Sequence, residues 1–143
     1  MIQASVDQLK YLELVQCLSQ ESQDKLMSEV MLITFTVGQQ MVPPEIIPGR
    51  ILVMLEGRAR LVGEDQGRVI SLGKFEAGAV LGAASLMCGA GLENLIASDA
   101  VVAAAISDEL WAEFYSSEPK FRNFCDAQLW ASEIVVVLKN LQQ

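Results

Sequence analysis

The chain has 143 residues, enough for one domain, and 52% of them are hydrophobic, enough for a substantial core. Its formal net charge of −8 disfavours nucleic acid as a partner, because phosphates bind to basic surfaces. The sequence contains no histidine, which excludes Ser–His and Cys–His catalysis and histidine-based metal sites. We therefore expect a chain that is not an enzyme, with no metal and no cofactor.

The cysteines and the N-terminus indicate where the chain works. Cys17, Cys88 and Cys125 are far apart in sequence and form no Cys-x-x-Cys pair, so we expect them to be small buried hydrophobes in a reducing compartment. The first residues lack a basic region followed by an apolar one, and no apolar run reaches membrane-spanning length. These features predict a cytoplasmic location with no direct membrane insertion of this segment.

The glycines divide the chain into three parts. All ten lie between Gly38 and Gly91, which predicts helical ends around a β-rich middle. We expect a single domain over 1–143, with N-terminal helices over 1–29, a β-barrel over 30–106 and C-terminal helices over 107–143.

The N-terminal part predicts two helices. Ser5 followed by Gln8 fits a capping box, and apolar residues at roughly helical spacing predict a helix over 6–18. Ser19 is a candidate N-cap for a second short helix that continues through Leu26 and Met27.

The middle of the chain predicts short strands separated by turn residues. The expected strands cover 30–37, 41–42, 51–55, 58–62, 68–72, 95–97 and 101–106. Strands this short, with a turn signal every few residues, are typical of a sandwich or barrel. The run Ala103–Ala105 leaves a helix open as an alternative to the last strand. The core is predicted to contain six of the apolar side chains, namely Phe35, Leu55, Leu61, Leu72, Leu81 and Ile106.

The stretch from Gly78 to Ala97 resembles a phosphate-binding loop in its layout. A short apolar strand meets Gly82, helix formers predict a short helix over 83–88, and Gly89 and Gly91 end it. A helix N-terminus presents unpaired N–H groups and a positive dipole end, which suit an anion. The alternative is a buried corner of the barrel, where glycines only permit close turns.

The C-terminal part predicts further helices. Ser107 is expected to open one that includes Trp111 and Phe114, and Pro119 suits the first turn of the next. The last helix carries the run Ile134–Leu138, which places apolar side chains on every face. That run predicts a homodimer, or docking onto neighbouring domains of a longer chain, through this helix.

Three motifs resemble the cyclic nucleotide-binding domain. Phe35-Thr-Val-Gly38 resembles the aromatic-x-x-Gly step of that family, and Leu55-Glu-Gly57-Arg-Ala-Arg-Leu61 resembles its Leu-x-Gly-x-x-x-Leu hairpin. Phe75-Glu-Ala-Gly78-Ala-Val-Leu81-Gly82 resembles the stretch before its phosphate-binding cassette. The resemblance covers about 18–121. It implies an α+β, mainly β fold, a double-stranded β-helix (jelly-roll) barrel with flanking helices.

The resemblance also implies a role and a context. It is closest to the N-terminal regulatory domain of bacterial, especially cyanobacterial, type I secretion ABC exporters that carry a peptidase domain. The chain has no room for the peptidase, membrane and ATPase domains, so we expect a non-catalytic regulatory domain taken from a longer protein. The alternatives are an interaction or dimerisation domain without ligand, the sensor half of a transcription regulator, or a binder of a different small nucleotide.

The departures from the family pattern concern ligand binding. The family has a Glu directly after the cassette glycine, which takes the ribose hydroxyl, and this chain has Ala83 there. Gly91 stands at the position of the Arg that pairs with the cyclic phosphate, and Asn94 stands near the Ser/Thr position. We therefore expect a degenerate cassette that binds little or no cyclic AMP or cyclic GMP. Its candidate contact residues are Gly82, Ala83, Ala84, Ser85, Gly91 and Asn94.

Four arginines of the predicted barrel could replace the missing anchor. They are Arg50, Arg58, Arg60 and Arg68, and period-two alternation places Arg58 and Arg60 on one strand face. The alternative is that all four face outward and balance an acidic surface.

Overall fold

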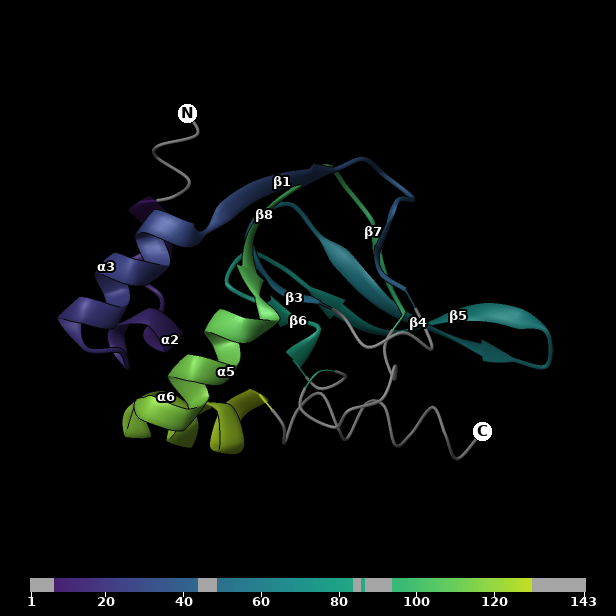
Figure 1. The fold of residues 1–143 in the computed structure, drawn as a ribbon. Coiled ribbons are helices and arrows are strands. Elements are labelled where there is room, and N and C mark those ends of the chain that lie inside the picture. The colour runs from purple at the N-terminus through teal and green to yellow at the C-terminus, as the bar shows by residue number, and fades with distance from the viewer. Residues whose placement is uncertain (1–6, 44–48, 84–85, 87–93, 130–143) are drawn as a thin grey trace.

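The computed structural model describes residues 7–43, 49–83, 86 and 94–129 (Figure 1). Helices precede and follow a set of strands that begins at Met31 and ends at Ser107. The elements are, in order, α2 (Glu13–Gln16), α3 (Gln20–Glu29), β1 (Met31–Phe35), β2 (Gln40–Val42), β3 (Arg50–Glu56), β4 (Ala59–Asp65), β5 (Arg68–Phe75), β6 (Val80–Leu81), β7 (Leu95–Ala97), β8 (Val101–Ser107), α5 (Asp108–Ser117), α6 (Pro119–Phe124) and the π-helical turn η1 (Cys125–Leu129).

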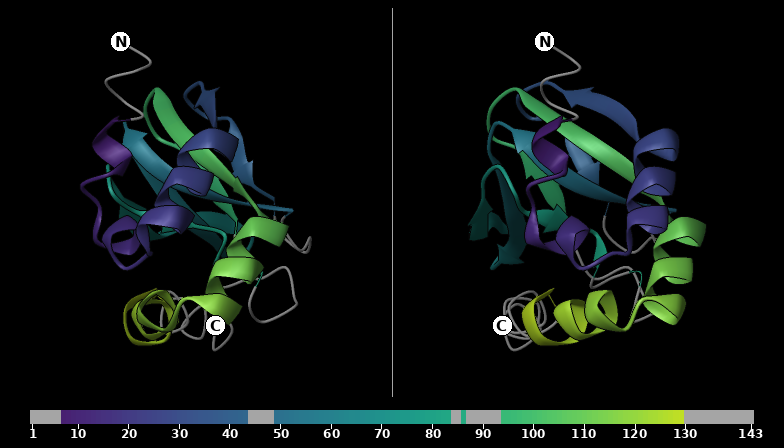
Figure 2. Two further views of the ribbon diagram at one scale, coloured as in Figure 1. Left: turned by 60° about the vertical axis from the view of Figure 1, so that its left-hand side comes forward. Right: turned by 90° about the vertical axis from the view of Figure 1, so that its left-hand side faces the viewer.

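The strands form two four-stranded antiparallel sheets. One sheet has the order β1-β8-β3-β6 and the other β2-β7-β4-β5. Neighbours in these orders are mostly distant in sequence, as in a jelly roll. Figure 2 shows from two further sides that the helices gather beside the strands, while the β4–β5 hairpin extends away from them in Figure 1.

The first sheet separates two hydrophobic clusters. Along β3 the buried side chains alternate, with Ile51, Val53 and Leu55 on the helix side and Leu52 and Met54 on the side of the second sheet. The helix-side cluster contains the buried residues Leu9, Leu14, Val15, Leu18, Leu26, Ile51, Val53, Leu55, Val80, Ala83, Ala104, Ile106, Leu110, Trp111, Phe114, Phe121 and Cys125. The barrel cluster contains Phe35, Met41, Val42, Leu52, Met54, Ala59, Leu61, Leu81, Leu95, Ala97, Val101 and Ala103.

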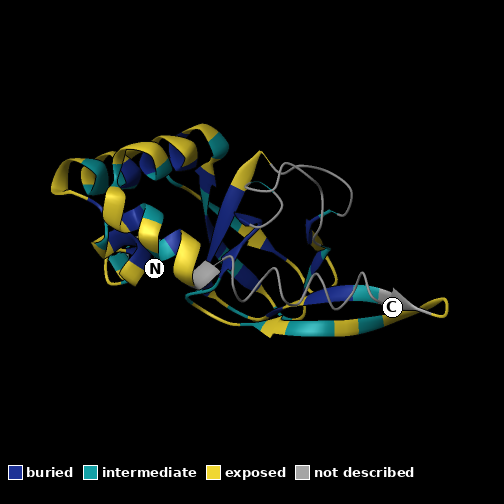
Figure 3. Cartoon of the chain, turned by 90° about the horizontal axis from the view of Figure 1, so that it is seen from below, coloured by how far each residue is buried: buried dark blue, intermediate teal, exposed yellow. Residues whose placement is uncertain are grey.

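Five of the six predicted core side chains are buried. Phe35, Leu61 and Leu81 lie in the barrel cluster, whereas Leu55 and Ile106 face the helices. The sixth, Leu72, is half-buried and packs against the barrel cluster. Leu72 is only half-buried because β5 is an edge strand, whose residues are all intermediate or exposed (Figure 3).

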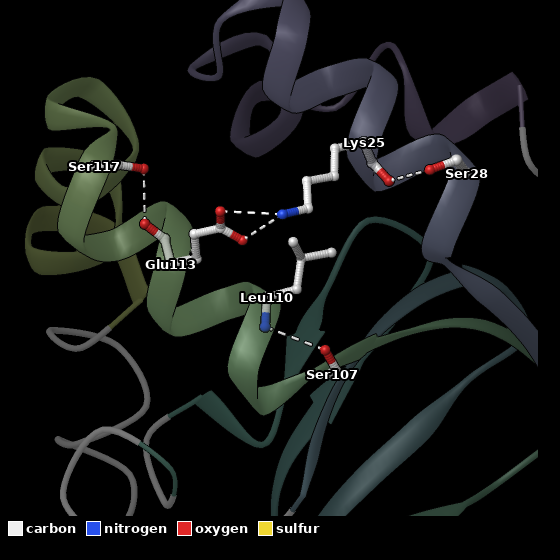
Figure 4. Close-up of polar contacts among 6 residues, drawn as sticks. All are labelled: Lys25, Ser28, Ser107, Leu110, Glu113 and Ser117. Atoms are coloured by element: carbon white, nitrogen blue, oxygen red, sulfur yellow. Dashed lines mark hydrogen bonds and ion pairs between the residues drawn. The ribbon is translucent and has the colours of Figure 1, made fainter.

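Helices α3 and α5 are joined by polar contacts as well as by the helix-side cluster (Figure 4). Lys25 Nζ donates to both carboxylate oxygens of Glu113, at 3.1 and 2.9 Å. The caps predicted at Ser19 and Ser107 are confirmed, since Ser19 Oγ accepts from Ser22 N and Ser107 Oγ accepts from Leu110 N. The cap predicted at Ser5 lies outside the described residues. Pro119 occupies the first turn of α6, as predicted.

The prediction of one helix over 6–18 is wrong. Residues 7–9 are helical, Lys10–Leu12 form a turn, and α2 begins afresh at Glu13. Leu12 has an extended backbone, with φ −73° and ψ 141°. This break lets the adjacent residues Leu14 and Val15 both reach the core, together with Leu9, which one continuous helical face would not allow.

The predicted strands are all present, with ends displaced by a few residues. The alanine run 103–105 is part of β8 and not a helix, because β1 and β3 pair with it on both sides. The predicted helix 83–88 is described only at Ala83 and Leu86, which are helical. The apolar run Ile134–Leu138 lies outside the described residues.

Candidate functional site

The predicted cassette begins at a glycine with a positive φ, a backbone conformation that other residues rarely adopt. Gly82 follows β6 with φ +94° and is buried. Leu86 N donates to Gly82 O at 3.1 Å, which closes the first helical turn after the strand. The strand–glycine–helix order predicted for this stretch is therefore present at its start. Ala84, Ser85 and Gly91 lie outside the described residues.

Ala83 occupies the position that the resemblance assigns to a ribose-binding Glu. Its exposed fraction is 0%, and it belongs to the helix-side cluster, not to the barrel cluster. Leu86, one turn further on, also packs against the helix-side cluster. The start of the cassette is thus an apolar contact between the barrel and the helices.

Asn94 connects three strands at the other end of the cassette. Its side-chain Oδ1 accepts from Gln40 Nε2 at 2.9 Å, and its carbonyl oxygen accepts from Val62 N at 2.9 Å. Gln40 begins β2, Val62 lies in β4, and Asn94 directly precedes β7. The side chain of Asn94 therefore already has a structural partner.

The four candidate replacement arginines do not converge on the start of β7. Arg50 begins β3 and Arg68 begins β5, and both are exposed. Arg58 and Arg60 do lie together, as predicted, but they line a pocket that also includes Ser98, the residue after β7. The cassette precedes β7, whereas Arg58 lies beside Ser98, after that strand, and Arg60 stands opposite its middle residue, Ile96.

Arg58 has a partner that the sequence does not predict. Its Nε and Nη2 donate to Asp99 Oδ2, at 3.3 and 3.0 Å. These hydrogen bonds, helped by the N–H of Ala100, hold the pKa of the Asp99 carboxyl below its usual value. The pair joins the β3–β4 turn to the β7–β8 turn, a non-local contact for which the sequence carries no local signal.

The β3–β4 turn also explains the glycine of the Leu-x-Gly hairpin motif. Gly57 has φ +95°, and a Cβ at this position would lie 2.1 Å from the carbonyl oxygen of Ala100. Only glycine fits so close to another backbone. The motif therefore marks the place where the β3–β4 and β7–β8 turns touch.

Two of the three cysteines match the prediction of small hydrophobes to different degrees. Cys125 is fully buried in the helix-side cluster, and burial raises the pKa of its thiol to about 12. Cys17 is half-buried against the same cluster, and burial also raises its pKa. Cys88 lies outside the described residues. A raised thiol pKa disfavours the reactive thiolate.

Among the helices in the described ranges, none combines the length and the apolar character needed to cross a membrane.

Comparison with known proteins identifies the fold. No protein-family model matches the sequence, and no curated protein does. Three similar solved structures are a regulatory subunit of a cAMP-independent protein kinase A from Trypanosoma cruzi bound to guanosine, the regulatory domain of Toxoplasma gondii protein kinase A with cAMP, and the catabolite activator protein of Thermus thermophilus.

The three proteins resemble this chain far more in structure than in sequence. The TM-scores are 0.77, 0.73 and 0.71, at sequence identities of 15%, 17% and 18%. The matches cover 94%, 92% and 88% of this chain, but only 49%, 49% and 60% of those chains. This chain thus corresponds to about half of each. Its fold is the cyclic nucleotide-binding-like jelly-roll barrel with flanking helices, as the sequence motifs predicted.

Proposed function

We propose that this chain is a non-catalytic regulatory domain that has kept the cyclic nucleotide-binding fold and lost the charged anchors for a cyclic nucleotide. The observation that carries the proposal is Ala83, which is completely buried among apolar side chains where the resemblance places a ribose-binding Glu. The sequence also has Gly91 where the resemblance places the phosphate-binding Arg.

The expected loss of affinity is large. A charge-assisted hydrogen bond to a buried phosphate contributes about 1.5–3 kcal/mol, and the ribose hydroxyl would lose its acceptor as well. Two such losses weaken binding by roughly two to four orders of magnitude, since 1.4 kcal/mol is a factor of ten. The helix N-terminus at Gly82 offers an anion only about 0.3–1 kcal/mol near a surface, which does not replace both anchors.

The fold is compatible with a different ligand as well as with no ligand at all. The Trypanosoma cruzi structure holds guanosine, a nucleoside without a phosphate. A site without a phosphate-binding Arg could bind an uncharged nucleoside or a different small nucleotide. In the wider context, we propose that the domain belongs to the cytoplasmic N-terminus of an ABC exporter, which rests on the sequence resemblance alone.

A second candidate function is protein interaction without ligand. The run Ile134–Leu138 would place apolar side chains on every face of a helix, more than one domain can cover. This run would then form a homodimer contact or dock onto a neighbouring domain of a longer chain. Val136→Glu should leave the domain folded and reduce its mass in sedimentation from dimer to monomer.

A thermal-shift panel separates the two candidates. The panel contains cyclic AMP, cyclic GMP, cyclic dinucleotides and guanosine, measured on the unmodified chain. The proposal expects no shift with cyclic AMP or cyclic GMP. A saturable shift with another compound favours a changed ligand, whereas a silent panel together with a dimeric mass favours the interaction domain. A saturable shift with cyclic AMP at micromolar concentration would overturn the loss of anchors.

A further inference from the structure

A recess lies beside the end of β7 that is away from the cassette. We call it the turn-end pocket and define it by Val37, Arg58, Arg60, Lys74, Phe75 and Ser98, which line it together with a few neighbours. Its volume is about 660 Å³, within the range of small-molecule sites. The residues come from β4, β5 and the turns after β1, β3 and β7, so several parts of the fold shape the recess.

Three of the ten Lys and Arg side chains of this acidic protein line the pocket. Arg60 stands directly opposite Lys74 in the register of β4 and β5. Like charges in such a cross-strand pair repel each other and destabilise the sheet. Among the residues that the structure describes, neither side chain has an ion-pair partner. An anion between them would remove this repulsion.

The third cation is oriented by its neighbour. Arg58 uses Nε and Nη2 to donate to Asp99, which fixes the plane of its guanidinium at the edge of the pocket. An arginine has five N–H donors, so others stay available for a ligand. Asp99 balances the charge of Arg58, and Glu76 is the one carboxylate in the lining, so Arg60 and Lys74 leave the pocket positively charged.

The rest of the lining is apolar or carries a hydroxyl. Val37 and Phe75 offer apolar surface, and Ser71 and Ser98 add hydroxyl groups that can donate to an anion. The combination suits a compact molecule with a doubly charged phosphate and a flat apolar part. A nucleic acid strand is disfavoured, because the net charge of −8 would repel it.

We propose that the turn-end pocket binds a small phosphate monoester that carries a flat ring, such as a nucleoside monophosphate. This site is separate from the cassette, so the proposal is independent of whether the cassette binds anything. Cyclic AMP has one negative charge where AMP has about two, so the cation cluster should favour AMP.

Isothermal titration of the full chain with AMP, inorganic phosphate, adenosine and cyclic AMP tests the proposal. AMP should bind with a dissociation constant on the order of 0.1 mM, and each of the other three at least about tenfold more weakly. The double variant Arg60→Gln with Lys74→Gln should weaken AMP binding about tenfold or more. The matched control, Arg50→Gln with Arg68→Gln, changes the net charge equally outside the pocket and should change binding less than about twofold.

Backbone amide NMR shifts locate the bound AMP. Gly38 and Ser98 should move on titration, and Ala83 and Asn94 should not. Absence of AMP binding, an equal loss in the control variant, or shifts confined to the cassette residues would each overturn the proposal. The last outcome would also count against the loss of anchors in the cassette, whereas the first two would leave that idea unaffected.

Discussion

The cassette and the turn-end pocket differ in packing and in charge. In the cassette, Ala83 is buried among apolar side chains and Asn94 accepts a hydrogen bond from Gln40. In the turn-end pocket, Arg60 and Lys74 stand opposite each other in the β4–β5 ladder, and neither has an ion-pair partner among the residues that the structure describes. The comparison teaches that the start of the cassette is part of the hydrophobic core, where a charge would be costly, whereas the pocket lies on the exposed surface, where charges are tolerated.

The largest expected effect concerns Ala83. Ala83→Glu would place a carboxylate among buried apolar side chains, and should destabilise the fold by about 3–5 kcal/mol. Urea unfolding followed by circular dichroism measures the change. Ala77→Glu makes the same substitution at an exposed turn and should change stability by less than about 0.5 kcal/mol. Equal stability of the two variants would show that Ala83 is not buried among apolar side chains.

The next effect concerns the turns that frame the pocket. Gly57→Ala combines a positive φ with a Cβ that would meet the Ala100 carbonyl oxygen, and should cost roughly 3 kcal/mol. Gly38→Ala is the matched control, because its φ is +85° but nothing lies within 4 Å of its Cβ, and it should cost about 1 kcal/mol. Both are measured as thermal unfolding midpoints. A smaller loss for Gly57→Ala than for Gly38→Ala would contradict the close contact.

A smaller effect of opposite sign tests the repulsion at the pocket. Arg60→Glu would place a carboxylate opposite Lys74 and replace a repulsive pair by an attractive one. The variant should be more stable than the natural chain by about 0.2–1 kcal/mol at low salt. Raising the salt concentration should reduce the gain, because exposed charges are screened. A loss of stability would mean that Arg60 has a favourable role in the free protein.

The smallest effect is an acid dependence at the β7–β8 turn. The hydrogen bonds from Arg58 lower the pKa of Asp99 below its unfolded value of about 3.9. The stabilising contribution is therefore present above that value and is lost as the pH falls through the folded-state pKa. Asp99→Asn should lower the urea midpoint at neutral pH, and the two proteins should converge in acid. A gap that persists in strong acid would assign the effect to packing.

Local sequence signals were sufficient for most of the fold. Polar caps and turn residues gave the helix starts and strand ends, as with Ser19, Ser107 and the turn before β5. The alanine run of β8 was ambiguous because only its pairing with β1 and β3 decides for a strand. The break at Leu12 was missed because it serves the packing of Leu14 and Val15 against distant elements.

The candidate site was less predictable. The motif spacing located Gly82 and Asn94 at the two ends of the cassette, but not the hydrogen bond that Gln40 gives to Asn94. Alternation along one strand grouped Arg58 with Arg60. It could not supply Lys74 or Asp99, because cross-strand register and turn-to-turn contacts are not encoded locally.

The loss of the cyclic-nucleotide anchors is tested most directly by isothermal titration of the unmodified chain with cyclic AMP and cyclic GMP. A far-ultraviolet circular dichroism spectrum with strand and helix signals confirms that the titrated sample is folded. The account predicts no saturable binding of either nucleotide at micromolar concentrations, since Ala83 and Gly91 replace both charged anchors. A saturable isotherm with a micromolar or smaller dissociation constant for either nucleotide would contradict it.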